Sequence, residues 1–324
     1  MSHETSAPLS EQSEFQFLDA EAQDVGLLGD LPPVARTGVQ TADGSVSAIA
    51  WGDAAPAVVL LHGAGLNAHT WDGTVLALGT PAIALDLPGH GDSTWRDDAD
   101  YRPRTIAPAV AEATAAIVGG TGSDAGSGTD AGTNSGTNSG IVLVGQSLGG
   151  LTAAIVAAAH PELVRALVIV DVSPSLNAST GASQVREFLS GPSDFASREE
   201  IVDRAIAFGF GPSRADVERG VFLNSRITQD GRAAWKHHFA NLGGIPEIEQ
   251  SAFSGIWADL EAVRVPVTLI AGTHGVLDAA QLAEFQERLT DSTIITIEAG
   301  HNIQEDAPVA LAAAIRDIVD GVTD

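Results

Sequence analysis

A short segment in the middle of the chain joins a run of branched apolar residues to a helix through a very tight turn. Residues 141–144 read as a buried strand, residues 145–149 spell Gly-Gln-Ser-Leu-Gly, and the Ala-rich stretch 148–159 reads as a helix. A serine on such a turn is held in a strained backbone conformation, so the residues two before and two after it must be small. The helix also directs free N–H groups and the positive end of its dipole towards Ser147. The segment therefore predicts that Ser147 is a nucleophile.

Strands and helices alternate along most of the chain. An antiparallel hairpin is predicted first, at residues 34–41 and 45–51. Buried strands are predicted at 57–61, 81–85, 141–144, 166–170, 265–271 and 293–297, and helices at 71–78, 105–118, 148–159, 279–289 and 308–319. This alternation predicts an α/β fold with a mostly parallel sheet, helices on both faces and an active site at the C-terminal ends of the strands.

Three segments depart from this alternation. Residues 1–33 hold seven acidic residues and no Lys or Arg, which predicts a mobile N-terminal segment, although its apolar residues could dock on the core. The low-complexity stretch 119–140 predicts a flexible surface loop. Residues 173–257 are rich in helix formers and aromatic side chains and lack a convincing strand, so we expect a helical cap over the sheet. The core would then comprise residues 34–172 and 258–324.

The charge balance narrows the possible functions. The chain has 42 Asp and Glu against 16 Lys and Arg, a formal net charge of −26, and such a surface repels nucleic acid and anionic lipid. No apolar run is long enough to cross a bilayer and the polar start lacks the pattern of a secretion signal, so we expect a cytoplasmic protein. Cysteine is absent, which excludes disulfides and a thiolate nucleophile. We find no metal cluster, phosphate loop or dinucleotide motif, and expect no metal and no other cofactor. The oligomeric state stays open.

Four motifs occur in one order and carry a resemblance to a known family. They are Leu-Leu-His-Gly-Ala-Gly at 60–65, Asp-Leu-Pro-Gly-His-Gly-Asp-Ser at 86–93, the turn at 145–149, and Gly-His at 300–301. From about residue 34 onward the chain resembles the α/β-hydrolase superfamily. The resemblance implies that Ser147 is the nucleophile and His301 the general base. It also implies an oxyanion hole formed by the backbone N–H groups of Ala64 and Leu148, with His62 shaping the loop that carries Ala64.

The resemblance also implies a carboxylic acid that completes a catalytic triad with Ser147 and His301. The sequence indicates this acid less directly. In many relatives the acid follows the strand matching 265–271, but this place is occupied here by Gly275. Asp171 ends the strand at 166–170, where several α/β hydrolases place their acid. Asp278 precedes a helix and has Gln281 three residues later, which is typical of a helix N-cap. We therefore expect Asp171 to be the acid and keep Asp278 as the alternative.

The resemblance implies a serine hydrolase that cleaves carboxylic esters of a small organic molecule, with water as the second substrate. A carbon–carbon bond hydrolase, a lactonase or an amidase of the same fold would use the same groups. A haloalkane dehalogenase or epoxide hydrolase is disfavoured, because those relatives carry Asp in place of Ser147. A non-catalytic ligand-binding protein or a cofactor-free oxygenase is a different class, and the intact Ser147 and His301 argue against it. The basic residues of the cap could recognise a carboxylate, but we expect them to pair with neighbouring Asp and Glu.

Overall fold

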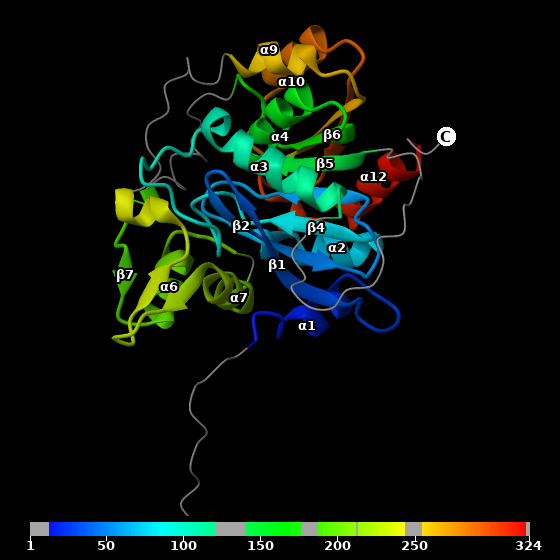
Figure 1. Cartoon of the computed structure of the whole chain (residues 1–324). Helices are drawn as coiled ribbons and strands as arrows, with labels where there is room; N and C mark the ends of the chain where they lie inside the picture. The colour runs from blue at the N-terminus through cyan, green and yellow to red at the C-terminus, as the bar shows by residue number, and fades with distance from the viewer. Residues whose placement is uncertain are drawn as a thin grey trace, which may run out of the picture.

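An eight-stranded sheet forms the centre of the molecule (Figure 1). The structure, a computed structural model, describes residues 13–120, 140–175, 187–188, 190–211, 213–243 and 255–321. In order across the sheet, the strands are β1 (Val34–Thr41), β2 (Gly44–Trp51), β4 (Ala82–Leu85), β3 (Val58–Leu61), β5 (Ile141–Gln146), β6 (Val164–Val170), β10 (Val267–Gly272) and β11 (Thr293–Ile297). β1 pairs antiparallel with β2, and β2 with β4, whereas the other neighbours run parallel.

Helices cover both faces of this sheet (Figure 1). One face carries α3 (Pro103–Val118), α4 (Leu148–Ala159), α9 (Ile256–Ala262) and α10 (Ala279–Arg288). The other carries the 3-10 helix η1 (Ala68–Trp71) with α2 (Asp72–Leu78), α11 (Ile303–Asp306) and α12 (Pro308–Gly321). Strands covered on both faces are apolar on both faces, which explains the continuous apolar runs of β3 to β6. Among the described residues, no helix combines the length and apolar character that crossing a bilayer requires.

The predicted α/β fold is confirmed. Each strand and helix predicted for the sheet and its covering layers is present, and the ends differ from the predicted ones by no more than two residues. β5 extends two residues further than its apolar run, to Gln146, so the strand reaches the residue before Ser147. The position of the turn relative to the sheet is therefore fixed by a fully hydrogen-bonded central strand.

The segment between β6 and α9 differs from the prediction of helices alone. It contains α6 (Arg198–Ala207), α7 (Arg214–Asn224) and the 3-10 helix η2 (His238–Leu242). It also contains an antiparallel sheet of β7 (Asp194–Phe195), β9 (Ala233–Trp235) and β8 (Ser225–Ile227), so the expectation of no strand is wrong. Strands of two or three residues are too short to show an alternating pattern. Residues 176–186 and 244–254 of the expected cap lie outside the described residues.

The described part of the N-terminal segment is docked on the core. Helix α1 (Leu18–Asp24) buries Leu18 and Ala22 against Leu76 of α2. Phe17 also meets Phe222 of α7 edge-on, with ring centroids 5.3 Å apart. The expectation of a mobile segment does not hold for residues 13–33, because a few apolar side chains suffice to anchor a short helix. Residues 1–12, and residues 121–139 of the predicted flexible loop, lie outside the described residues.

Candidate active site

Ser147 lies in the sharp turn between β5 and α4. Its backbone has φ 52° and ψ −118°, a conformation that is uncommon for a residue with a side chain. Close backbone contacts require both flanking glycines. A Cβ on Gly145 would lie 2.3 Å from the carbonyl oxygen of Gly149, and a Cβ on Gly149 would lie 2.4 Å from that of Leu61. The turn holds Ser147 at the C-terminal end of the central strand.

His301 and Asp171 meet at the same end of the sheet. His301 follows β11, and its Nδ1 lies 2.8 Å from Oδ2 of Asp171, the residue after β6. The Asp171 carboxylate is fully buried and also accepts the backbone N–H groups of Gly272 at 3.0 Å and Val276 at 2.9 Å. A buried carboxylate needs such donors, because its charge is otherwise costly to remove from water. These contacts fix the carboxylate in an orientation that directs one oxygen at the imidazole.

The loop after β10 explains why glycine replaces the acid that many relatives carry there. A Cβ on Gly275 would lie 2.2 Å from Oδ1 of Asp171, so the Asp171 carboxylate occupies the space that a side chain at position 275 would need. Asp278 is the N-cap of α10: its Oδ1 accepts the N–H of Gln281 at 2.8 Å, and the Gln281 side chain accepts the N–H of Asp278 at 2.9 Å. Only Asp171, of the two candidates, contacts His301. His274, in the loop after β10, is exposed.

His62 joins the loops that follow β3 and β4. Its buried Nε2 accepts the backbone N–H of Leu87 at 2.9 Å, and its Nδ1 donates to the carbonyl oxygen of Gly63 at 2.7 Å. Burial lowers the pKa of His62 to about 4, so the ring is neutral and its two partners define this tautomer. Gly63 in turn lies against the nucleophile, since a Cβ there would be 3.2 Å from Cβ of Ser147. The loop that continues into Ala64 therefore passes beside Ser147.

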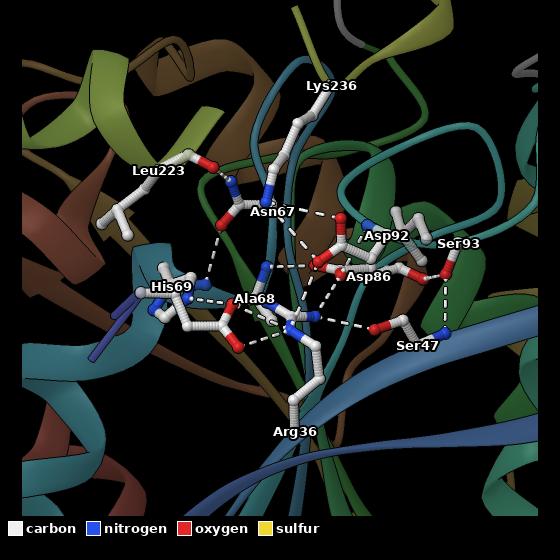
Figure 2. Close-up of polar contacts among 12 residues, drawn as sticks. Arg36, Ser47, Asn67, Ala68, His69, Asp86, Asp92, Ser93, Leu223 and Lys236 are labelled. Carbon is white, nitrogen blue, oxygen red and sulfur yellow. Dashed lines mark hydrogen bonds and ion pairs between the residues drawn. The ribbon is translucent and has the colours of Figure 1, made fainter. Parts of the chain in front are cut away.

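Asp86, the first residue of the second motif, organises these loops (Figure 2). Its buried carboxylate accepts the backbone N–H of Ala68 at 2.8 Å and that of Asp92 at 3.0 Å. Arg36 of β1 supplies the opposite charge, with Nη1 2.8 Å from Oδ2 of Asp86. The motif at 86–93 thus has a structural role in fixing the loops after β3 and β4.

The expected pairing of the cap's basic residues with Asp and Glu holds for four of those that the structure describes, and three others lie over aromatic rings. Ion pairs link Arg214 to Glu199, Asp203 and Glu218, Arg219 to Glu21, Arg232 to Asp194, and Lys236 to Asp92. The guanidinium groups of Arg198, Arg204 and Arg226 lie over the rings of Phe222, Phe208 and Trp95. Several of these contacts cross to the core or to the N-terminal segment, so they hold the cap in place.

Gln146 is a residue that sequence reasoning does not single out. It is buried at the end of β5, and its Nε2 lies 3.1 Å from Nε2 of His301. Its only signal in the sequence is its place directly before Ser147, which does not say where the side chain points. Among the described residues, Ser147 Oγ makes no hydrogen bond to His301, and Nε2 of His301 contacts Gln146 instead.

Fold and site together define the class: an α/β hydrolase with a serine at the nucleophile position. The chain belongs to the alpha/beta hydrolase family, whose sequence model matches residues 58–314.

Individual relatives agree with this family. The chain is 36% identical over 319 residues to the esterase Rv0045c of Mycobacterium tuberculosis, covering 95% of this chain and 96% of that protein. A crystal structure of that esterase matches the fold with a TM-score of 0.78 and 34% identity, covering 96% of this chain and 99% of the other. The chain is also 30% identical over 285 residues to the pimeloyl-(acyl-carrier protein) methyl ester esterase of Neisseria meningitidis, covering 83% of this chain and 96% of that protein.

Proposed function

We propose that this protein is a carboxylic ester hydrolase that forms an acyl-enzyme on Ser147, with His301 as general base and Asp171 as the acid of the triad. The observation that carries the proposal is the 2.8 Å contact between Asp171 and His301 at the sheet edge where the turn holds Ser147. Similarity to an esterase over nearly the whole chain supports the reaction class.

The chemistry follows from the direction of that contact. Because Nδ1 of His301 donates to Asp171, its Nε2 carries the lone pair that accepts the Ser147 proton when substrate is bound. The serine oxygen attacks the ester carbonyl, and the backbone N–H groups of Ala64 and Leu148 stabilise the oxyanion, each by ~3 kcal/mol. His301 then protonates the leaving alcohol and activates the water that hydrolyses the acyl-enzyme.

The proposed substrate is a small ester without a free carboxylate. The described basic side chains of the cap are already engaged by carboxylates and aromatic rings, which supports an uncharged substrate. The division into a core of residues 34–172 and 258–324 and a cap of residues 173–257 belongs to the proposal, with the cap selecting the substrate. The cytoplasmic location remains a prediction.

Covalent labelling tests the nucleophile directly. A fluorophosphonate probe should label the folded protein at Ser147 and leave the folded Ser147→Ala variant unlabelled. Folded wild-type protein without a Ser147 adduct would show that the hydrolase proposal is wrong.

A substrate panel tests the reaction class and the substrate. Esters that vary in acyl and alcohol length, with and without a free carboxylate, should be compared with the matching amide, lactone and carbon–carbon bond substrates. We expect turnover to be highest for uncharged esters. Preferential cleavage of an amide or a carbon–carbon bond would replace the ester assignment while keeping the same catalytic groups.

A further inference from the structure

Gln146 contacts two loops of the active site from one buried position. Its side chain amide lies at the end of β5 and is almost entirely inaccessible to solvent. Nε2 lies 3.1 Å from Nε2 of His301, 3.2 Å from the main-chain oxygen of His301 and 3.4 Å from Oδ1 of Asn302. On the other side, Oε1 is directed at Gly63, where an added Cβ would be 2.1 Å from it. Gln146 therefore lies between the loop that carries Ala64 and the loop that carries His301.

The imidazole has one lone pair for two donors. Nδ1 of His301 donates to Asp171, so Nε2 of the neutral ring is an acceptor with a single lone pair. The Gln146 amide donates one N–H to this lone pair, and its second N–H reaches the main-chain oxygen of His301. Ser147 needs the same lone pair when it gives up its proton. The amide and the serine therefore compete for one atom of the base.

We propose that Gln146 is a positioning residue: it fixes the loop that carries His301 and occupies the imidazole Nε2 until Ser147 takes that place. The inference rests on the proposed function of Ser147 and His301. Gln146 acts through His301 and does not itself touch the reacting ester. Anchoring the main-chain oxygen as well as the ring keeps the imidazole within reach of Ser147 while the hydrogen bond at Nε2 is exchanged.

A second buried glutamine provides the matched control. Gln304 of α11 is also almost inaccessible, and its Oε1 likewise has no hydrogen-bond partner within the described part of the chain. Its Nε2 donates to Oγ1 of Thr70 at 3.0 Å and not to the imidazole. Gln304→Met therefore removes a buried amide of the same kind without removing a hydrogen bond to His301.

The first test removes the donor. Gln146→Met keeps the length of the side chain and loses the N–H groups. Loss of the contact with the main-chain oxygen releases the loop that positions His301, so kcat for an activated ester should fall about tenfold, the effect of one lost hydrogen bond. KM should stay within about twofold of the wild-type value, because substrate contacts are unchanged. Gln304→Met should lower the thermal unfolding midpoint while kcat and KM remain near the wild-type values.

The second test changes the charge beside the imidazole. Gln146→Glu is almost isosteric and places a carboxylate next to Nε2, which favours the protonated ring, so the acid limb of the kcat/KM profile should move to higher pH by about one unit or more. Among the described residues, the acidic groups hydrogen-bonded to His301 or its loop are Asp171 after β6 and Glu305 and Asp306 of α11. None of them changes in this variant, so the movement of the profile reports the contact with residue 146. If Gln146→Met does not fold, Gln146→Glu alone tests the inference.

Two results would overturn the inference: a Gln146→Met variant that keeps kcat within twofold, or a Gln146→Glu profile that coincides with that of the wild type. Fluorophosphonate labelling separates this failure from failure of the proposed function. If wild-type Ser147 is not labelled, the hydrolase proposal itself fails. If it is labelled and the Gln146 variants behave like Gln304→Met, only the positioning role is lost.

Discussion

Asp171 and Gly275 share one small volume at the end of the sheet. The carboxylate of Asp171 lies where a side chain at position 275 would project, so acid at one position requires the absence of a side chain at the other. Gly275 marks the place where many relatives have their acid, and the same glycine makes room for the acid to come from the neighbouring strand. The chain therefore departs from the familiar motif only in the strand that supplies the carboxylate. The contact between carboxylate and imidazole is kept.

Substitution of the two candidate acids separates their roles. Asp171→Asn should lower kcat by about four orders of magnitude, because an amide stabilises the wrong imidazole tautomer and cannot stabilise the imidazolium. Asp278→Ala should leave kcat unchanged and lower the free energy of unfolding by ~1 kcal/mol through loss of the helix cap. Steady-state kinetics on an activated ester and urea unfolding measure the two quantities. Loss of activity in Asp278→Ala, with Asp171→Asn active, would reverse the assignment.

Gly275→Ala tests the shared volume without touching either candidate acid. The added methyl would lie 2.2 Å from Oδ1 of Asp171, so the carboxylate must move away from His301. A displacement of this size in the proposed acid of the triad should lower kcat by about 100-fold. Gly220→Ala is the matched control, because a Cβ there meets nothing within 4 Å. Equal kcat values for the two variants would contradict the packing argument.

At the level of residues, sequence motifs predict those site residues whose position depends on their immediate neighbours in the chain. Ser147 is marked by the small residues its turn requires, and His301 by its place after the last strand. Asp171 is predicted only through the order of the strands, because its contact with His301 joins distant parts of the chain. Gln146 gives no such signal. Where a strand-end amide points depends on the path of the loops around it, and a single sequence does not determine that path.

At the level of elements, burial on both faces makes the central strands easy to predict. The sheet and its covering helices have apolar runs or helical periodicity long enough to be recognised. The strands of the cap are two or three residues long and take their apolar contacts from α6, α7 and one another, as Phe195, Ile201, Val221 and Trp235 do in their common cluster. Such strands depend on tertiary contacts, which local pattern does not contain.

The N-terminal segment is held to the core by ionisable groups before its helix begins. Glu14 pairs with Arg36 at 2.6 Å and with His69 at 3.2 Å, and His69 Nδ1 lies 2.9 Å from Asp72. Burial acts to raise the pKa of Glu14, but the hydrogen bonds from His69 and Arg36 outweigh it and lower that pKa to about 2. Burial likewise acts to lower the pKa of His69, but Asp72 and Glu14 outweigh it, and the net pKa is raised.

These shifts define the pH window in which the contact stabilises the fold. The contribution of Glu14 is complete above its ordinary pKa of 4.5 and is lost as the pH falls towards 2. The contribution of His69 is complete below its ordinary pKa of 6.5 and is lost as the pH rises through its raised value in the folded protein. The difference in unfolding free energy between wild type and Glu14→Gln should therefore be largest between these two ordinary pKa values.

Urea unfolding of wild type and Glu14→Gln across this range measures that difference. The difference in unfolding free energy should shrink at low pH, where Glu14 is protonated. At high pH it should shrink only in part, because the ion pair with Arg36 survives when His69 loses its proton. A difference that is constant across the whole range would show that Glu14 contributes through packing alone.

At the scale of the whole molecule, the charge excess should make stability depend on salt. Forty-two acidic residues against 16 basic ones leave repulsion that the ion pairs cannot cancel. Raising sodium chloride from low concentration to about 1 M shortens the Debye length to about 3 Å and should raise the thermal unfolding midpoint by several degrees. Differential scanning calorimetry measures this midpoint. Near pH 4.4, the isoelectric point of the sequence, the effect should vanish, and a midpoint that falls with salt at neutral pH would contradict this account.

The contact between Asp171 and His301 joins positions 130 residues apart, across β10, which lies between β6 and β11. The turn around Ser147 needs only β3, β5, β6 and α4, all of which precede Asp171 in the chain. During synthesis the serine can thus reach its final backbone conformation long before the histidine has been translated. A polypeptide still on the ribosome, or one cut short before β11, carries Ser147 without the proposed base His301. With His301 as the proposed base, we expect activity to appear only after β11 has joined the sheet and His301 has met Asp171, so the onset of activity would mark the completion of the fold.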